Sequence, residues 1–238
     1  MPTNKTCHGF ADAVSDIPDG ASIMVGGFGG AGGLPFRLLT ALRDHGARRL
    51  TIISNTAGVS MVTGFGWPKG EKPIDHSILF ENGQVARFIG TYPVPGSVSL
   101  RNAFQAAFDR KEVALELVPQ GTFVERIRAG GAGIPAFFTP TAAGTRLAEG
   151  KEVRTFDGRA CVMERALRAD FAFVRAAVAD TLGNLMYVGS SRAFNPAMAT
   201  AADITIAEVD RIVPPGKIDP ERVGTPGVYV DRVVARSA

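Results

Sequence analysis

The chain has 238 residues, of which 45% are hydrophobic and 21% are charged, and its formal net charge is +3. This length suits one large α/β domain or two small ones, and the composition is ordinary for a globular protein. Basic and acidic residues are interspersed, so the sequence lacks the basic stripe of a nucleic-acid-binding protein. No segment reaches the roughly 18 uninterrupted apolar residues of a membrane span, and the first residues lack a signal-peptide pattern. We therefore expect a cytoplasmic protein.

The first 55 residues contain the unit that defines the fold class. Residues 10–14 are predicted to form a short helix, and the apolar run "SIMVGG" (22–27) a strand buried on both faces. The segment "LPFRLLTALRDHG" (34–46) repeats leucine at helical spacing between an early proline and a final glycine. "RRLTIISN" (48–55) is predicted to be the next strand. Together these segments predict a right-handed βαβ crossover, which places the chain in the α/β class.

Residues 59–83 are expected to form an irregular excursion, after which strands and helices alternate again. Strands are predicted within residues 84–90, 113–121, 169–180, 181–189, 204–213 and 227–235, and helices at 100–111 and from 122 to the glycines at 130–133. The segment "VRTFDGRACVME" (153–164) is predicted to be a hairpin that turns at Asp157-Gly158. No repeat or linker divides the sequence, so residues 1–238 are predicted to form a single domain.

The glycines after the first strand form the motif G-x-G-x-x-G at Gly27, Gly29 and Gly32. A strand that turns at once into a helix needs positive φ angles, and a ligand approaches the backbone closely only where a Cβ is missing. The N-terminus of the following helix offers unpaired N–H groups, so the loop is a candidate cradle for a phosphate or thioester. A dinucleotide site also needs an acidic residue at the end of the second strand, where Ser54 and Asn55 stand instead. The sequence therefore disfavours an NAD site.

Two side-chain amides follow strands at the edge where open α/β sheets place their ligands. Asn55 ends the second strand and Gln120 ends a later one, so each is a candidate donor to a carbonyl or carboxylate oxygen. The alternatives are a turn-forming asparagine and an exposed loop amide. Asn195 is a weaker candidate, because asparagine before proline commonly begins a turn.

The histidines and cysteines form no recognisable catalytic or metal centre in the sequence. His8, His45 and His76 have no neighbouring Ser, Cys or Asp in the pattern of a triad, so each is expected at the surface or in a local structural role. No group of His, Cys and carboxylates has metal-ligand spacing. Cys7 and Cys161 are expected to be reduced thiols.

The segment after Gln120 offers two arginines and a glycine cluster. Arg126 and Arg128 are expected to face solvent, with pairing to an anionic substrate as the alternative. The glycines at 130, 131 and 133 are expected to end a helix, and their flanks also suggest a wall of the site.

Several of these segments together resemble one enzyme family. "DGASIMVGGFGGAGGLP" (19–35) is similar to the first signature of the family I coenzyme A transferases of the 3-oxoacid and 3-oxoadipate type. The resemblance continues in order through residues 50–58, 116–145 and 180–203, and the length resembles the A (alpha) component of the two-subunit enzymes. The sequence departs from the pattern by one extra residue before Pro35 and by a longer stretch at about 59–82.

The resemblance implies a three-layer α/β/α fold with a mostly parallel sheet and a CoA-transferase activity. In this family the attack on the acyl-CoA comes from a glutamate of a separate B (beta) subunit, and a glutamyl-CoA thioester forms and is resolved by an acceptor carboxylate. CoA is then a substrate, with no permanent cofactor or metal, and the chain works in a hetero-oligomer, as a heterotetramer. Asn55 and Gln120 would be supporting donors. The residues expected to contact CoA are Gly26, Gly27, Phe28, Gly29, Gly30, Ala31 and Gly32.

One glutamate of this chain resembles the nucleophile of the B subunit. Glu81 begins a Glu-Asn-Gly string like the short motif around that nucleophile. In register with the alpha subunits, however, the string only leads into the strand at 84–90. A turn through Asn82-Gly83 accounts for it, so we do not expect Glu81 to react.

Four other functions remain open on the sequence alone. A CoA-ester hydrolase would keep the fold and use water as the acceptor. A sugar-phosphate isomerase-like protein would bind a phosphorylated sugar on a related fold, and a dinucleotide oxidoreductase is disfavoured by Ser54 and Asn55. A degenerate CoA-binding or regulatory module would have lost its partner. No residue pattern identifies the acyl group, and the 59–83 segment is where its pocket is expected to be shaped.

Overall fold

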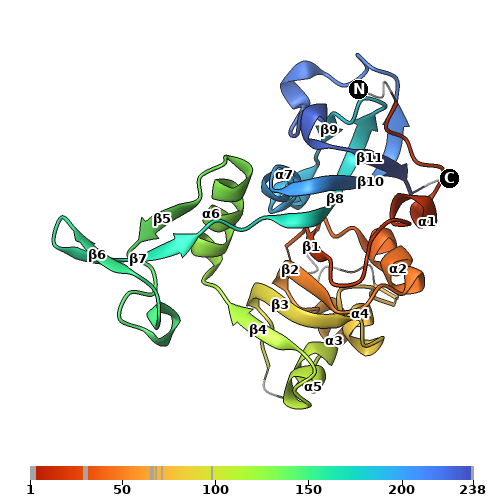
Figure 1. Cartoon of the computed structure of the whole chain (residues 1–238). Helices are drawn as coiled ribbons and strands as arrows, with labels where there is room; N and C mark the ends of the chain where they lie inside the picture. The colour runs from red at the N-terminus through yellow and green to blue at the C-terminus, as the bar shows by residue number, and fades with distance from the viewer. Residues whose placement is uncertain are drawn as a thin grey trace.

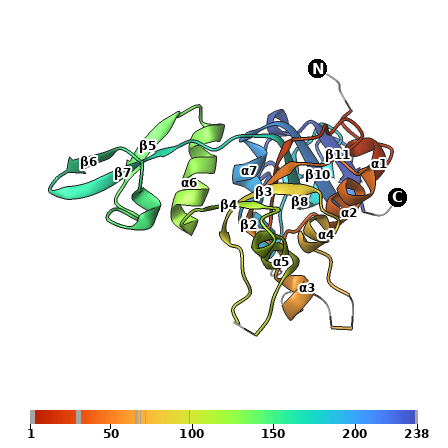
Figure 2. The same cartoon turned by 60° about the horizontal axis from the view of Figure 1, so that its bottom comes forward.

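The computed structural model describes residues 4–28, 32–64, 67, 69–70, 72–97 and 99–236. In this part of the chain the strands form two separate sheets, one of eight strands and one of three. The larger sheet carries helices on both faces and makes up the body of the molecule, whereas the smaller sheet extends away from that body (Figures 1 and 2).

The larger sheet is almost wholly parallel. Among the described residues its strands lie in the order β11-β10-β8-β1-β2-β3-β4, and the short β9 pairs with β8 in the antiparallel direction. The strands are β1 (Ser22–Val25), β2 (Leu50–Thr56), β3 (Val85–Tyr92), β4 (Ala114–Leu117), β8 (Ala169–Asp180), β9 (Leu185–Met186), β10 (Ala202–Val213) and β11 (Arg232–Ala235). Parallel neighbours have their carboxyl ends at one edge, so the segments that follow β1 to β4 gather there.

Helices cover both faces of this sheet, and an apolar cluster fills the space on each side. One cluster joins Ile23 and Ile52 to Leu38, and the other joins Met24 and Ile53 to Phe123. Successive strand residues point to opposite faces, which is why neighbouring positions fall into different clusters. The first face carries α1 (Phe10–Ala13), α2 (Phe36–His45), α4 (Ser77–Glu81) and α5 (Ala103–Asp109), and the second carries α6 (Gln120–Gly131) and α7 (Asn195–Ala199). The predicted three-layer α/β/α arrangement is confirmed.

The predicted crossover lies at the centre of the sheet. β1 and β2 pair in parallel, with Ile23 beside Ile52, and α2 connects them. Helix α2 ends at Gly46, whose φ of 85° is a left-handed conformation that favours glycine. Leu34 precedes the helix instead of belonging to it, yet its side chain is buried in the first cluster.

The 59–83 segment is less irregular than expected. It contains α3 (Ser60–Thr63) as well as α4, and its other described residues have no regular secondary structure. Its entrance is fixed by Asn102, the N-cap of α5, whose Nδ2 donates to the carbonyl oxygens of Gly58 at 3.0 Å and Pro93 at 2.8 Å. One buried asparagine therefore joins the loop after β2, the loop after β3 and the start of α5.

The smaller sheet is antiparallel and contains the predicted hairpin. β7 (Arg159–Arg165) lies between β5 (Ala136–Thr139) and β6 (Val153–Phe156). The turn residues Asp157 and Gly158 have φ angles of 49° and 74°, as a type I′ turn requires. Every residue of β6 is exposed, in contrast to the buried strands of the main sheet.

Two late strands are shorter than predicted. The strand expected within 181–189 is limited to β9, and the 3-10 helix η2 (Gly189–Arg192) follows it. Within residues 227–235 the strand is limited to β11, because Tyr229 N–H and Val230 N–H bond back to Pro226 and Gly227 and form the 3-10 helix η4 (Gly227–Tyr229). The remaining 3-10 helices are η1 (Arg146–Ala148) and η3 (Pro220–Arg222).

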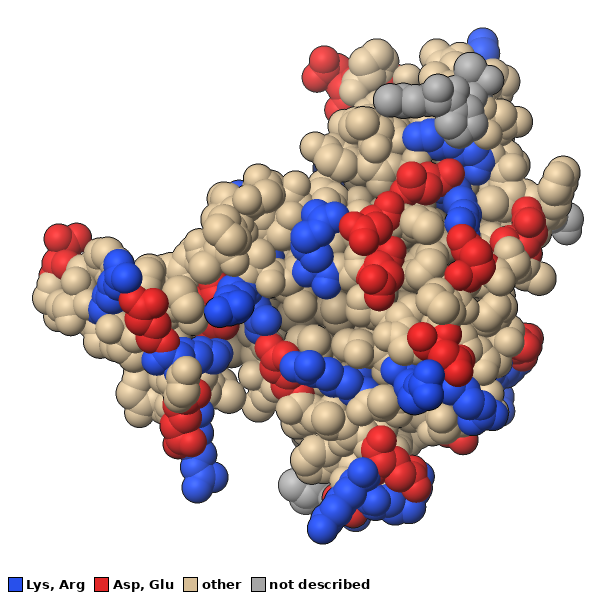
Figure 3. All heavy atoms as spheres, in the orientation of Figure 1, with Lys and Arg blue, Asp and Glu red and all other residues tan. Residues whose placement is uncertain are grey.

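Charged side chains of both signs are mixed over the surface. On the face shown in Figure 3, Lys and Arg alternate with Asp and Glu and form no continuous basic stripe. Among the described residues, no helix combines the length and the apolar character that crossing a bilayer requires.

Candidate active site

The carboxyl edge of the main sheet brings the predicted site residues together. β1 ends at Val25 and continues into the glycine loop, β2 ends with Asn55 and Thr56, and β4 leads through Pro119 to Gln120, the first residue of α6. Because these strands are parallel, the three segments emerge on the same side of the sheet. The glycine loop and the two amides therefore belong to one region.

Asn55 and Gln120 form a direct hydrogen bond. Gln120 Nε2 donates to Asn55 Oδ1 at 2.8 Å, across 65 positions of sequence. Asn55 is only 4% exposed, whereas Gln120 lies at the surface. The contact fixes the orientation of the Asn55 amide, because its Oδ1 is the acceptor. The two amides predicted as site residues are therefore in direct contact at the carboxyl edge of the sheet.

The glycine loop is packed closely against α7. A Cβ on Gly26 would lie 1.8 Å from Asn195 Oδ1, and one on Gly33 would lie 2.6 Å from Asn195 Nδ2. Gly27 and Gly32 also have positive φ angles of 101° and 148°. Glycine at these positions is therefore required by the turn and by the approach of Asn195. Three of the residues predicted to contact CoA, Gly29, Gly30 and Ala31, lie outside the described residues.

Asn195 is a structural residue of this region. Its side chain is fully buried, accepts the backbone N–H of Arg175 at 2.9 Å, and donates to the carbonyl oxygens of Gly33 and Ser191, both at 2.9 Å. These bonds use the amide's oxygen and both of its N–H donors. Asn195 thus joins the loop to β8 and η2, and its weak candidacy as a ligand-binding amide is not supported.

The N-terminus of α2 is already occupied by a carboxylate of the same chain. Glu208 of β10 is fully buried, and its Oε2 accepts the backbone N–H groups of Arg37 at 3.0 Å and Leu38 at 3.1 Å. Burial raises the pKa of Glu208 to about 7, and those N–H groups with Arg175 and Arg236 oppose that rise. The expectation that this helix N-terminus offers these N–H groups to an external anion is wrong.

This geometry can be set beside known proteins. Residues 8–236 match the family model described as coenzyme A transferase. The chain belongs to the coenzyme A transferase family.

Named members of the family align over almost the whole chain. The chain is 44% identical over 230 residues to the A subunit of the probable succinyl-CoA:3-ketoacid coenzyme A transferase of Bacillus subtilis, covering 97% of this chain and 89% of that protein. It is 47% identical over 234 residues to the A subunit of the 3-oxoadipate CoA-transferase of Pseudomonas putida, covering 98% and 94%. An acyl-CoA transferase of Escherichia coli O157:H7, solved as a thioester complex with CoA, shares the fold with a TM-score of 0.79 and 22% identity, covering 98% of this chain and 49% of that one.

One contact next to Asn55 is not predicted by the sequence. His76 is 2% exposed, and its Nε2 lies 2.9 Å from Ser54 Oγ, so of the two predicted settings, the surface or a local structural role, the surface is excluded for this residue. His8 and His45 are exposed, as expected. Ser54 and His76 are 22 positions apart, and only the fold places them in contact. A single polar pair at that separation has no periodicity that the sequence would reveal.

The Ser54–His76 contact does not extend to a triad. Asp75 precedes His76, but its Oδ1 accepts Ser77 N–H at 2.9 Å and its Oδ2 accepts Met61 N–H at 3.0 Å. His76 Nδ1 is buried and has no hydrogen-bond partner among the described residues. The carboxylate therefore organises the backbone of the 59–83 segment instead of orienting the imidazole.

The arginines of α6 differ from each other. Arg126 is buried and donates to Glu116 Oε1 at 2.6 Å and to the carbonyl oxygen of Arg165 at 2.8 Å, so the expectation of solvent exposure is wrong for it. Arg128 is exposed, as expected, and pairs with Glu125. Both guanidinium groups are thus paired within α6 and the strands near it.

The glycines at the end of α6 are packing residues. A Cβ on Gly130 would lie 2.2 Å from the carbonyl oxygen of Leu167, and one on Gly131 would lie 2.1 Å from Thr200 Oγ1. Gly133 has a φ of 72° just after the helix. A helix of 12 residues is about 18 Å long, so this end of α6 is far from Gln120 at its start. The helix-end interpretation is confirmed, and a wall of the active site is not supported.

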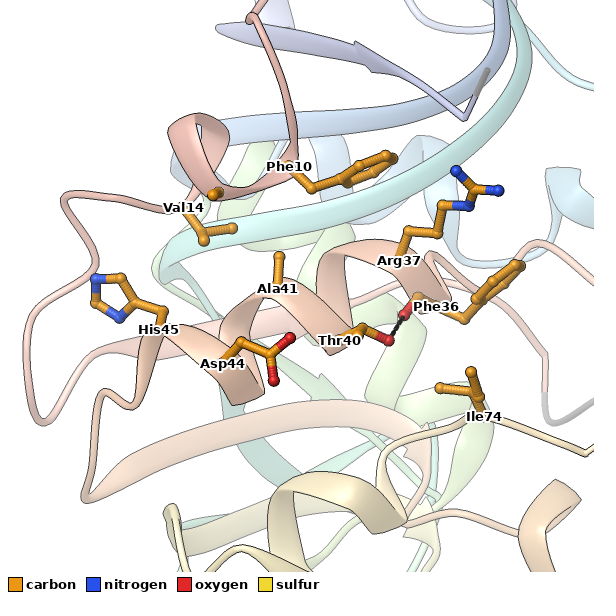
Figure 4. Close-up of a pocket in the computed structure, with 10 residues that line it drawn as sticks. Phe10, Val14, Phe36, Arg37, Thr40, Ala41, Asp44, His45 and Ile74 are labelled. Atoms are coloured by element: carbon orange, nitrogen blue, oxygen red, sulfur yellow. Dashed lines mark hydrogen bonds between the residues drawn. The ribbon is translucent and has the colours of Figure 1, made fainter. Parts of the chain in front are cut away.

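Two hollows border these elements. A surface hollow of about 550 Å³ lies between α1 and α2 and is lined by Phe10, Val14, Phe36, Ala41 and Ile74 among others (Figure 4). Neither Asn55 nor Gln120 is among its lining residues. A smaller hollow of about 190 Å³ borders the glycine loop and is lined in part by Gly32, Gly33, Ser191 and Arg175. No group of three His, Cys or carboxylate residues in the described part of the chain is arranged to hold a metal ion.

Proposed function

We propose that this chain is the alpha component of a two-subunit CoA-transferase that moves CoA between an acyl-CoA, such as succinyl-CoA, and a 3-oxoacid. The Asn55–Gln120 pair carries this proposal. Two amides held against each other at the carboxyl edge supply fixed donors for an acyl oxygen, and both lie where the family's ligands are expected. The A subunits of the Bacillus subtilis and Pseudomonas putida enzymes align over 97% and 98% of this chain and support the same assignment.

The nucleophile in this proposal is a glutamate of the partner B subunit. It attacks the acyl-CoA carbonyl, which gives an acyl-glutamyl anhydride and CoA thiolate, and the thiolate then forms the glutamyl-CoA thioester that the acceptor carboxylate resolves. Within the chain, Glu81 is a poor alternative because it ends α4 just before β3 begins, at the amino edge of the sheet. Asn55 lies at the opposite, carboxyl edge.

The glycine loop is proposed to contact CoA or the thioester through its backbone. Gly26, Gly27, Phe28 and Gly32 are the described members, and Gly29, Gly30 and Ala31 complete the proposed set. Support comes from the smaller hollow beside the loop and from Asn195, which fixes the loop's path. Because Glu208 fills the N-terminus of α2, the proposed contacts are to loop backbone and not to that helix end. CoA is a substrate in this scheme, and no resident cofactor is invoked.

The direct test is reconstitution. The chain is co-expressed with its B-type partner, and transfer from succinyl-CoA is measured with acetoacetate or 3-oxoadipate as acceptor. We expect transfer by the complex, little by the chain alone, and co-purification as a hetero-oligomer, a heterotetramer by light scattering. A full rate from the isolated chain would contradict the two-subunit proposal.

Two further arms separate the alternatives. Omitting the acceptor acid tests hydrolysis, because a hydrolase would release CoA at the same rate without it. Treating the acyl-CoA-loaded complex with borohydride or hydroxylamine should modify the glutamyl-CoA thioester with release of CoA, and peptide mapping should locate the modified residue at a B-subunit glutamate. Modification of a residue of this chain would overturn the assignment of the nucleophile to the partner.

The same experiments bear on organisation and location. We propose that residues 1–238 act as one domain, because β7 of the smaller sheet ends only a few residues before β8 of the larger sheet begins. We also propose that the complex is located in the cytoplasm. Limited proteolysis should leave the two sheets connected, and cell fractionation should recover the complex with cytoplasmic markers. A stable fragment containing only the larger sheet would contradict the single-domain assignment.

A further inference from the structure

Ser54 and Asn55 point to opposite faces of β2. Ile52 belongs to the cluster under α2 and α4, and Ile53 belongs to the cluster under α6. By the two-residue period of a strand, Ser54 faces the first layer and Asn55 the second. This direction matches their partners, since Ser54 contacts His76 beside α4 and Asn55 contacts Gln120 of α6. The proposed function uses Asn55 only.

The two hydrogen bonds of Ser54 determine which group donates in each of them. A hydroxyl group has one proton to donate. Ser54 Oγ lies 3.1 Å from the carbonyl oxygen of Val25, which can only accept, so the serine donates there. The contact of 2.9 Å with His76 Nε2 is then donated by the imidazole. His76 is thereby assigned the Nε2–H tautomer, with Nδ1 unprotonated.

The surroundings keep the imidazole neutral. Burial lowers the pKa of His76 to about 4, and the nearby carboxylate of Asp75 only partly opposes that shift. A neutral ring with a bare Nδ1 agrees with the lack of any partner for that atom among the described residues. The proton on Nε2 is therefore held on the Ser54 side of the ring at neutral pH.

The hydrogen-bonded series His76–Ser54–Val25, called the relay below, borders the proposed site at two points. Ser54 immediately precedes Asn55, and Val25 immediately precedes Gly26 of the glycine loop. The backbone of Ser54 also packs closely against β3, because a Cβ on Gly90 would lie 2.1 Å from the carbonyl oxygen of Ser54. The Ser54 side chain thus joins the carboxyl ends of β1 and β2 to each other and to His76 of the 59–83 segment.

We propose that His76 is a positioning residue that, through Ser54, fixes the ends of β1 and β2 and so aims Asn55 and the glycine loop at the reacting groups. The proposal rests on the proposed function of Asn55 as a donor. It also gives the long 59–83 segment a role, because the segment that carries His76 is anchored by Asp75 to the start of α3 at Met61. Ser54 itself is not a nucleophile here, since it is 1% exposed and its proton is directed to Val25.

The tautomer is measured on the intact chain without any activity assay. Nitrogen-15 NMR of histidine-labelled protein needs to resolve only three residues. We expect one histidine in the Nε2–H form whose shifts stay constant between pH 8 and about pH 5, and Ser54→Ala should perturb that signal alone. A Nδ1–H form, or titration of the His76 signal near the ordinary histidine pKa, would overturn the inference.

Kinetics of the complex with the B subunit test the positioning role. His76→Leu removes the donor, and His76→Gln keeps an N–H near the position of Nε2. We expect His76→Leu to lower kcat by about 10- to 100-fold with little change in KM, and His76→Gln to restore most of it. Ser54→Ala, a smaller change, should lower kcat in the same direction and serves if His76→Leu does not fold.

A double-mutant cycle separates this inference from the proposed function. If His76 acts through Asn55, then His76→Leu added to Asn55→Ala should lower kcat far less than it does in the parent. Fully additive losses would show a general structural role and overturn the inference while the role of Asn55 stands. Full activity of Asn55→Ala alone would instead overturn the proposed function.

Discussion

Two strand-to-helix junctions at the same edge of the sheet are built in opposite ways. At the β1–α2 junction, Asn195 packs into the glycine loop and Glu208 fills the helix N-terminus. At the β4–α6 junction, no side chain of the described residues caps the helix, and Gln120 lies at the surface and reaches toward Asn55. The first junction is closed by the chain itself, and the second is open.

The difference shows that a motif that is easy to recognise in the sequence does not always leave its polar groups free to bind a ligand. Much of the glycine loop at β1–α2 serves internal packing, because Gly26 and Gly33, which flank the motif, are required by the approach of Asn195, and a Cβ on Gly32 would lie 2.2 Å from Ser190 Oγ. In the part of the chain that the structure describes, Gln120 of the short "PQG" sequence at β4–α6 bonds to Asn55, and a Cβ on Gly121 would meet nothing within 4 Å. Chemistry at this edge should therefore depend most on the open junction, and stability most on the closed one.

Removal of the amide donors should have the largest effect. We expect Asn55→Ala in the reconstituted complex to lower kcat by about 100- to 1,000-fold, as loss of one oxyanion donor does. Gln120→Ala should act in the same direction but less, because Gln120 orients Asn55. Steady-state CoA transfer measures both. The melting temperature serves as the control, and a loss of activity that merely follows a loss of folding would contradict the assignment.

Glu208→Ala should have the largest effect on stability. The change leaves the N–H groups of Arg37 and Leu38 unpaired and removes the carboxylate that lies 3.5 Å from Arg236 Nε. We expect a loss of about 3 kcal/mol in the free energy of unfolding, measured in urea. Glu208→Gln keeps an oxygen that can accept from the helix, so it should lose less. Equal stability of the alanine variant and the parent would show that this junction is not held closed by Glu208.

Gly26→Ala tests the packing of the closed junction. The added Cβ would lie 1.8 Å from Asn195 Oδ1, so the asparagine must move and its bond to Arg175 N–H must stretch or break. We expect a loss of about 2 kcal/mol in unfolding free energy. Differential scanning calorimetry of the variant checks it. If the variant melts with the parent, the loop does not pack on Asn195 as described.

The closed junction and the relay should respond to pH in opposite directions. The folded-state pKa of Glu208 is raised to about 7, so its stabilising contribution is full below its ordinary value of 4.5 and is lost as pH rises through 7. The folded-state pKa of His76 is lowered to about 4, so unfolded chains gain its proton first and stability falls as pH drops from 6.5 toward 4. Between pH 4.5 and 6.5 the two effects oppose each other.

Single variants should separate the two contributions to the pH dependence of the unfolding free energy. In Glu208→Gln the contribution of His76 remains, so stability should rise with pH across this window more steeply than in the parent. In His76→Gln the opposite change of slope is expected. Each slope is at most about 1.4 kcal/mol per pH unit for one proton. Urea unfolding at half-unit pH steps measures both, and unchanged slopes in both variants would show that neither group titrates as described.

The architecture and the gathering of the proposed site residues at one edge of the sheet were largely predictable, but the contacts between those residues were not. Apolar periodicity and turn glycines identify β1, α2 and β2 because these signals are local. Asn55 and Gln120 are recognisable as amides at strand ends. That they bond to each other, and that Glu208 reaches α2 from β10, depends on contacts between distant segments. No pattern at position 208 marks it as the cap of a helix about 170 residues earlier.

Gly121→Ala should have the smallest effect and is the matched counterpart of Gly26→Ala. A Cβ at Gly121 would meet nothing within 4 Å, and this residue lies in the first turn of α6. Alanine is favoured over glycine in a helix, so we expect a gain of up to about 1 kcal/mol in unfolding free energy. Transfer activity should be retained, since the Gln120–Asn55 bond is not disturbed. A destabilised Gly121→Ala would mean that the β4–α6 junction is as closely packed as the β1–α2 junction, and the contrast between the two would be lost.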